Sequence, residues 1–252
     1  MGIPTVTDQS AGLLAYAPRL TIEWLERYPG RQHLTVEGSM AFVDISGFTA
    51  LTERLARKGK VGAEEMSDIL DSTLGALVQA ARADGADLVK WGGDAVLLLF
   101  RGPDHARHAT RATCRMRKTL RTVGRQRASA GNVTLRMSAG IHSAAFSFFL
   151  VGDPAIHQEL IVCGESASMT AQMESLATAG QIVVSNATAA LLPPDVLGAR
   201  IHGGRVVQAE PLAPDISVTE STRSQADIAN TLPPPIRTQL LLARGESEHR
   251  RG

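Results

Sequence analysis

The chain has 252 residues, of which 44% are hydrophobic and 20% charged, proportions that are ordinary for a globular protein. Its 26 Lys and Arg residues are balanced by 25 Asp and Glu residues, for a formal charge of +1. This balance argues against nucleic acid as a partner, because such a partner favours a strongly basic surface. Cys114 and Cys163 lack the spacing of a zinc site and are expected to be reduced thiols in a cytoplasmic protein.

No segment is expected to enter a membrane. The apolar run 144–151 contains Ser147 and is far shorter than the ~20 residues that a spanning helix needs. Residues 1–14 carry no basic residue before their apolar part, so a signal peptide is not expected either. The sequence therefore predicts a cytoplasmic location and no membrane partner.

The first expected elements are a helix and a strand. Residues 12–28 predict a short amphipathic helix, which Pro29-Gly30 ends. Its apolar side carries Leu20, Trp24 and Leu25. The apolar run MAFVDI, which begins at Met40, predicts a strand that a Ser-Gly pair stops.

Two helices are expected next, one reaching about Lys58 and a longer one after a turn at Gly59 and Gly62. The longer helix has the clearest periodicity in the chain, with apolar or small residues three and four apart. These residues are Met66, Ile69, Leu70, Thr73, Leu74, Leu77, Val78 and Ala81. Asp84-Gly85 is expected to end this helix, one face of which should be buried.

A hairpin follows, because two apolar runs, ADLVKW and AVLLLF, flank the Gly92-Gly93 pair. Residues 103–127 then predict a helix with an apolar inner face: Ala106, Ala109, Thr113, Met116, Leu120 and Val123. The expected outer face is basic: Arg107, Arg111, Arg115, Arg117, Lys118, Arg121 and Arg125. We interpret it as a solvated helix face and not as a surface for RNA or lipid.

The remaining pattern predicts strands at 132–141, 145–151 and 158–163, a helix at 165–177 and a strand at 181–185. This order favours an α+β fold, with helices over one face of a mainly antiparallel sheet. The expected organisation is an N-terminal helical extension (1–38), one domain (39–208) and a flexible linker or tail (209–252), rich in Pro and polar residues.

Two aspartates stand at chain reversals of the expected sheet. Asp44 lies near the end of its strand, and Asp94 follows the Gly92-Gly93 pair. Carboxylates at neighbouring strand ends are the ligands that hard divalent cations need. Ser46 and Gly47 come directly after Asp44 and lead into a helix, where backbone N–H groups could approach a triphosphate.

Two longer strings around these aspartates, FVDISGFTALTERLA (42–56) and LVKWGGDAVLLLF (88–100), resemble the two metal motifs of class III adenylyl and guanylyl cyclases. The resemblance is close over residues 40–100 and weaker to about 191. It implies a ferredoxin-like cyclase domain that works as a head-to-tail dimer, with its active sites at the interface. The implied substrate is ATP, which becomes cyclic AMP and pyrophosphate.

By this resemblance, two Mg²⁺ ions, with Mn²⁺ as an alternative, bind Asp44, Asp94 and the Ile45 carbonyl. The turn formed by Ser46, Gly47, Phe48 and Thr49 would contact the terminal phosphates. Lys90 matches the lysine that reads the adenine edge, where guanylyl cyclases usually carry a Glu. From the residue alone, Lys90 is equally well a side chain that extends from a half-buried strand into solvent.

The other half of the family's site is degenerate here. Ser168 stands where active chains have Asn, and Gln172 where they have the Arg that stabilises charge on pentavalent phosphorus. Ile161 occupies the second base-recognition position. The pattern resembles the first of the two unequal domains in tandem proteins related to soluble adenylyl cyclase, and the tail from Pro233 resembles their linker. We therefore expect a second cyclase domain, in trans or in a longer chain.

Two alternatives compete with this interpretation. Gly92-Gly93-Asp94 is similar to the GGDEF signature of diguanylate cyclases, but Ala95-Val96 replaces its Glu-Phe. The chain could instead be an inactive pseudo-cyclase that binds Mg-ATP or regulates a partner. None of the seven histidines has the spacing of a metal-ligand motif.

Overall fold

A computed structural model describes residues 17–128, 131–216, 228–234 and 237–238. The chain divides into two compact units. Unit 1 comprises residues 1–36, 147–163 and 219–252, and unit 2 comprises residues 37–146 and 164–218. Two long strands, β1 (His33–Ser46) and β6 (Arg136–Asp153), contribute residues to both units.

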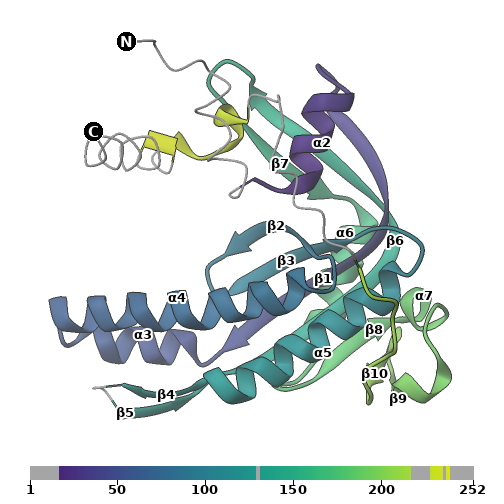
Figure 1. Ribbon diagram of the computed structural model, residues 1–252. Coiled ribbons are helices and arrows are strands. Elements are labelled where there is room, and N and C mark those ends of the chain that lie inside the picture. Colours follow the sequence, from purple (N-terminus) through teal and green to yellow (C-terminus); the bar gives the residue numbers. More distant parts are fainter. Residues whose placement is uncertain (1–16, 129–130, 217–227, 235–236, 239–252) are drawn as a thin grey trace. The chain divides into compact units, whose positions relative to one another are not determined.

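The strands form one eight-stranded sheet in the order β2-β3-β1-β6-β8-β10-β9, with β7 paired to β6 (Figure 1). Their bounds are β2 Asp87–Gly92, β3 Ala95–Phe100, β7 His157–Cys163, β8 Ile182–Ser185, β9 Leu197–Ile201 and β10 Gly204–Val207. Strands β6 and β8 are parallel, whereas β1 and β2 are both antiparallel to β3. This arrangement confirms the expected α+β fold with a mainly antiparallel sheet.

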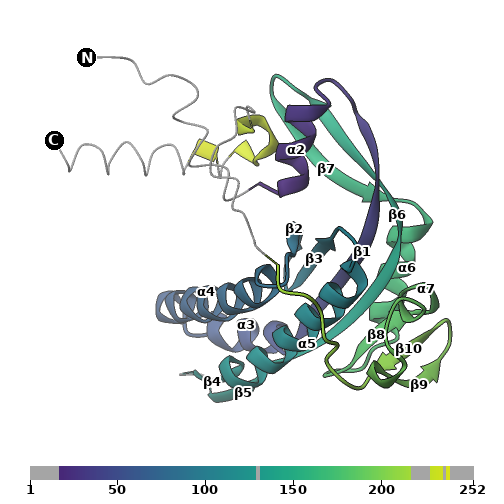
Figure 2. The same ribbon diagram turned by 45° about the vertical axis from the view of Figure 1, so that its right-hand side comes forward.

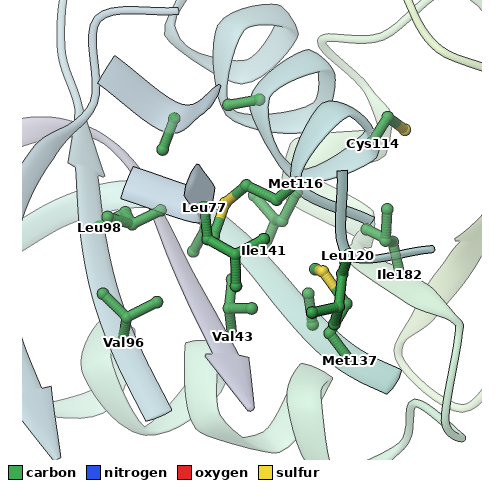
Figure 3. Close-up of a cluster of buried hydrophobic side chains, with 14 of the residues drawn as sticks. Val43, Leu77, Val96, Leu98, Cys114, Met116, Leu120, Met137, Ile141 and Ile182 are labelled. Carbon is green, nitrogen blue, oxygen red and sulfur yellow. The ribbon is translucent and has the colours of Figure 1, made fainter. Parts of the chain in front are cut away.

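Three helices, α3 (Phe48–Ala56), α4 (Lys60–Arg82) and α5 (His105–Val123), lie over one face of the unit 2 sheet (Figure 2). The core forms between this face and α4 and α5 (Figure 3). It contains alternate strand residues such as Val43, Leu98 and Ile141, together with Leu77 and Met116 from the helices. Each large apolar side chain buried in this way contributes about 1.5–3 kcal/mol to stability.

Helix α6 (Glu165–Ser175) packs on the opposite face, so the expectation of helices over one face alone is wrong in this detail. Gly140 makes this packing possible. A Cβ built on Gly140 would lie 2.0 Å from the backbone nitrogen of Glu174, too close for any side chain. Its neighbours Ala139 and Ile141 point the other way, into the core beside α4 and α5.

Several element boundaries differ from those expected. The first described helix, α2, covers Arg19–Arg27, and β1 begins seven residues before Met40, at His33. The expected strand 145–151 is the continuation of β6. Gly62 lies inside α4 and not in a turn, with its α-carbon packed against the Leu55 carbonyl. Helix α5 ends at Val123, and a separate hairpin of β4 (Arg125–Ala128) and β5 (Gly131–Thr134) follows.

Among the described residues, several further elements had no sequence prediction: α7 (Asn186–Ala189), the short helices η2 (Pro194–Val196) and η3 (Ala229–Thr231), and the β9–β10 hairpin.

The largest correction on α5 concerns Arg111, which was expected on the solvated face. Its side chain is buried, with 6% of the residue exposed, and its Nε donates to Asp84 Oδ1 over 2.6 Å. Periodicity placed Arg111 wrongly because it cannot show that a buried carboxylate on another element neutralises the guanidinium.

Unit 1 contains α2, β7 and the short helix η3 (Ala229–Thr231). Trp24 of α2 is buried, and its Nε1 donates to the Arg31 carbonyl over 2.7 Å. Ile22, Ile228 and Leu232 form a small core. Residues 228–234 of the expected tail thus pack in unit 1, while residues 217–227 and 239–252 lie outside the described residues. The division at residues 38 and 208 stays a prediction.

Within the described ranges, no helix combines the length and the apolarity that are needed to cross a membrane.

Three buried or half-buried histidines predict that the fold loses stability in mild acid. Burial lowers the pKa of His105, His108 and His142 in the folded chain below 6.5. The unfolded chain therefore binds more protons, and stability falls as pH falls below about 6.5. We expect a lower melting temperature at pH 5.5 than at pH 7.5. His108→Leu should reduce this difference, and His202→Gln, in the exposed β9–β10 turn, should leave it unchanged. Equal melting temperatures at both pH values would contradict the assignment.

Candidate active site

Asp44 and Asp94 are brought together by the pairing of β1 with the β2–β3 hairpin. Asp44 lies opposite Ala95 in the β1–β3 ladder, and the Ile45 N–H donates to the Asp94 carbonyl over 3.1 Å. Gly92 pairs with Ala95, so the loop is the dipeptide Gly93-Asp94. The turn therefore lies one position later than the expected Gly92-Gly93 pair, and Asp94 is part of it. Gly93 has φ 68°, as the first loop residue of a type II′ hairpin requires.

The electrostatics of the site show that negative charge is crowded around Asp44. This side chain is half-buried. Burial raises the pKa of its carboxyl group above 3.8, and the charges of Asp94 and then Glu174 raise it further. A divalent cation would relieve this repulsion, because it neutralises carboxylates that the fold holds close to one another.

The chain turns sharply directly after Asp44. Gly47 has φ 100°, in the left-handed region that favours glycine, and it lies at the N-terminal end of α3. Phe48 is buried in the core and anchors the helix, whereas Thr49 is exposed. The Ser46 hydroxyl donates to the Arg136 carbonyl over 3.3 Å. The first N–H groups of α3 are thus those of Gly47, Phe48 and Thr49, close to Asp44 in sequence. Such N–H groups at a helix N-terminus suit an anion.

Lys90 lies on the same hairpin as Asp94. Its side chain is exposed, it pairs with Leu97, and the β2–β3 register shifts between Leu88 and Lys90. The sequence prediction of Lys90 as a base-reading residue is compatible with this exposed position, and it stays a prediction.

Helix α6 carries the positions of the second half-site. Ser168 and Gln172 are exposed on its surface, one turn apart. Ile161 is half-buried on β7 and belongs to unit 1. Glu174, which the sequence analysis did not single out, is half-buried near Asp44, and its Oε1 accepts a hydrogen bond from Ser138 Oγ over 2.8 Å. Nothing local to the sequence identifies Glu174, because its proximity to Asp44 arises from the close packing of α6 against β6.

The described residues hold no cluster of three or more His, Cys, Asp or Glu side chains with the geometry of a metal cage. The candidate donors at the strand ends are the carboxylates of Asp44 and Asp94 and the carbonyl of Ile45. This set fits Mg²⁺, which commonly uses one or two carboxylates and completes its shell with water and substrate phosphates.

The crowded charge predicts that Asp44 destabilises the metal-free chain. Its pKa is raised in the folded state, so the ionised form present at pH 7.5 is less favourable there than in the unfolded chain. Asp44→Asn removes the charge and keeps the shape, and we expect a higher melting temperature without metal. Asp68→Asn, on the exposed side of α4, is the matched control. A lower melting temperature for Asp44→Asn alone would contradict this account.

Comparison with known proteins places this geometry in a family. Residues 32–206 match the adenylate and guanylate cyclase catalytic domain. Human adenylate cyclase type 10 is 25% identical over 152 residues, which make up 59% of this chain and 9% of that protein. The membrane guanylyl cyclase of Dictyostelium discoideum is 29% identical over 161 residues, or 63% of this chain and 10% of that protein. The match thus involves a small part of each of these proteins.

Solved structures show the same fold. The adenylyl cyclase CyaB from P. aeruginosa superimposes with a TM-score of 0.60 at 23% identity, over 74% of this chain and 100% of that chain. The guanylate cyclase domain of RhGC from Catenaria anguillulae, in complex with GTP, gives 0.59 at 20% identity, over 70% and 99%. The chain therefore belongs to the adenylate and guanylate cyclase catalytic domain family.

Proposed function

We propose that the chain provides the metal-binding half of an adenylyl cyclase site that converts ATP to cyclic AMP and pyrophosphate in intracellular signalling. The observation that supports this most is the junction of β1 with the β2–β3 turn. It sets Asp44 opposite the residue that follows Asp94 and places the Gly47 turn directly after it. Two carboxylates and a helix N-terminus at one sheet end suit a metal-bound triphosphate.

In this proposal, Asp44, Asp94 and the Ile45 carbonyl hold two Mg²⁺ ions, or Mn²⁺. Bound there, the ions would supply Lewis-acid chemistry: activation of the ribose 3′-oxygen and neutralisation of charge on the phosphates. The N–H groups of the turn from Ser46 to Thr49 bind the terminal phosphates, and Phe48 keeps the turn fixed through its burial. Lys90 donates to the adenine edge from the exposed side of the hairpin.

The chain does not supply the rest of the chemistry. Negative charge that develops on the phosphorus needs a fixed cation, and Gln172 at the expected arginine position provides none. Ser168 likewise replaces the asparagine. We infer that a second cyclase domain contributes these groups, either in trans or within a longer chain, which agrees with the small share of the human relative that this chain matches.

The choice of ATP over GTP rests on Lys90 and on the adenylate cyclase relatives, although a guanylyl cyclase is among the relatives too. A cytoplasmic location is part of the proposal. It agrees with the two cysteines, which are both free, Cys114 buried and Cys163 exposed.

A second candidate function is a pseudo-cyclase that binds Mg-ATP and regulates its partner without turnover. The degenerate positions Ser168, Gln172 and Ile161 favour it. The retained pair Asp44 and Asp94 disfavours a module that only docks to its partner, because charge crowding without a ligand only destabilises the chain. Binding of Mg-ATP without any cyclic AMP formation, in the presence of a complementary domain, would establish the pseudo-cyclase.

The purified chain alone should form little or no cyclic AMP. A homodimer would lack the arginine and the asparagine in both of its sites, so the transition state would be left without its compensating charge. Mixing the chain with a cyclase domain that carries these two residues but lacks the aspartate pair should restore the activity. Rapid turnover by the chain alone would mean that another cation replaces the missing arginine.

In the reconstituted enzyme, Asp44→Ala and Asp94→Ala should each abolish activity, because each removes a ligand of the ions that carry the chemistry. Asp68→Ala, on the exposed side of α4, should leave the rate unchanged. Lys90→Glu replaces a donor with an acceptor and should lower kcat/KM for ATP relative to GTP. Rates with both nucleotides test these expectations. Full activity of Asp94→Ala would reduce Asp94 to a turn residue.

A further inference from the structure

A buried ion pair lies in unit 2 outside the candidate site. The Asp84 side chain is fully buried at the end of α4, and 7% of the Arg111 side chain is exposed. Arg111 Nε donates to Asp84 Oδ1 over 2.6 Å, and Arg115 Nη1 donates to the same oxygen over 3.3 Å. Both arginines were expected on a solvated helix face, and Asp84 was expected in a helix-ending turn.

The same arginines bind residues 208–216, which we call the strap. Arg111 Nη1 donates to the Ala213 carbonyl, and Nη2 donates to the Pro214 carbonyl over 3.0 Å. Arg115 Nε donates to Glu210 Oε1 over 3.0 Å. The strap was expected to be part of a flexible tail, but these contacts hold it against α5.

Contacts at both ends of the strap agree with this docking. The N–H groups of Gln208 and Ala209 donate to the Val196 carbonyl over 2.9 and 3.4 Å. At the other end, the Ile216 side chain covers Gly85, where a built Cβ would lie 2.7 Å from Ile216 Cδ1. The strap is thus held at its start, in its middle and at its end.

The chemistry of arginine explains why the ion pair and the strap depend on each other. A guanidinium has five N–H donors in a rigid fork, and a buried one needs both a counter-charge and acceptors for its remaining donors. Asp84 supplies the charge, and two strap carbonyls supply acceptors. Without the strap, the Nη atoms of Arg111 would lose these acceptors.

The ion pair is a poor device for stability alone. Asp84 Oδ2 is buried and has no hydrogen-bond partner among the described residues. Removing two charges from water is costly, and apolar residues often replace such a pair without loss of stability. The Asp84–Arg111 pair has a second effect, because Arg111 also holds the strap in one position. The fold gains this position of the strap at the free-energy cost of burying the two charges.

We propose that the strap is a docked connector and that Arg111 is the latch that fixes its position on α5. Asp84 lies three residues before the start of β2, whose hairpin carries Lys90 and Asp94 at its far end. A pull on the strap therefore acts through Arg111 on the start of the hairpin that carries candidate site residues. The latch is independent of nucleotide and metal and does not rest on the proposed reaction.

The test compares Arg111→Lys with Arg107→Lys. Lysine keeps the charge for Asp84 but cannot span the carboxylate and two carbonyls at once. Arg107 lies one turn away on α5, with 42% of its side chain exposed, and pairs only weakly with Asp104 at 3.8 Å. A nitroxide on Leu212→Cys, in a Cys163→Ser background, reports the motion of the strap, because Leu212 is 90% exposed and its replacement disturbs no packing.

We expect a restricted nitroxide in the parent chain and in Arg107→Lys. In Arg111→Lys the ratio of mobile to restricted label should rise ~10-fold or more, since hydrogen bonds from a charged donor are lost. The spectra are recorded without nucleotide or metal, so a failure of the proposed reaction cannot affect them. A label that is equally mobile in all three chains would overturn the latch.

A second variant covers the case in which Arg111→Lys does not fold. Asp84→Asn/Arg111→Met removes both buried charges together, so no charge is left unpaired in the core. The proposal requires a folded chain with a mobile strap. A folded double variant with a restricted strap would show that Arg111 serves the core alone and would overturn the proposal.

Discussion

The register of β1 against the β2–β3 hairpin is the constraint on which the candidate site depends. The ladder from Ser39–Phe100 to Asp44–Ala95, closed by the Ile45–Asp94 hydrogen bond, brings together two aspartates that are fifty residues apart in sequence. A slip of one residue would turn Val43 and Ile45 out of the core and Asp44 into it. Burial of apolar residues therefore fixes the register, and the register fixes the positions of the two carboxylates. These apolar residues are Val43, Ile45, Val96 and Leu98.

Holding Asp44 in its ionised form lowers the stability of the metal-free fold. Asp44 is half-buried beside the charge of Asp94 and within the influence of Glu174, which raises its pKa and makes its ionised form unfavourable in the absence of a cation. An isolated structural aspartate would gain nothing from such a position. Functional sites commonly carry charge that the surrounding core must compensate, and here the compensation is the well-packed interface between the sheet, α4 and α5.

The two halves of the family's site, at the β1–β3 end and on helix α6, differ in how far this chain keeps the residues of the family. The β1–β3 end retains Asp44 and Asp94, which we propose to bind the metal ions. Helix α6 is folded and exposes Ser168 and Gln172, so in the proposed function this half-site lacks side-chain chemistry and not structure. The proposed pairing with a second cyclase domain therefore requires no change of fold. The proposed arginine latch would fix the strap on the same domain.

The sequence by itself determined the α+β fold and the family, because strand alternation, the helix periodicity of residues 66–81 and two motifs with several fixed residues are local patterns. It also identified Asp44, Lys90 and Asp94, whose roles stay predictions. Only the tertiary structure decided that Glu174 lies near Asp44, that Arg111 is buried and that residues 208–216 are docked. These features depend on the contacts between segments distant in sequence: α6 with β6, and α5 with Asp84 and the strap. A local pattern records which face a residue occupies, but it does not record which distant charge or carbonyl meets it there.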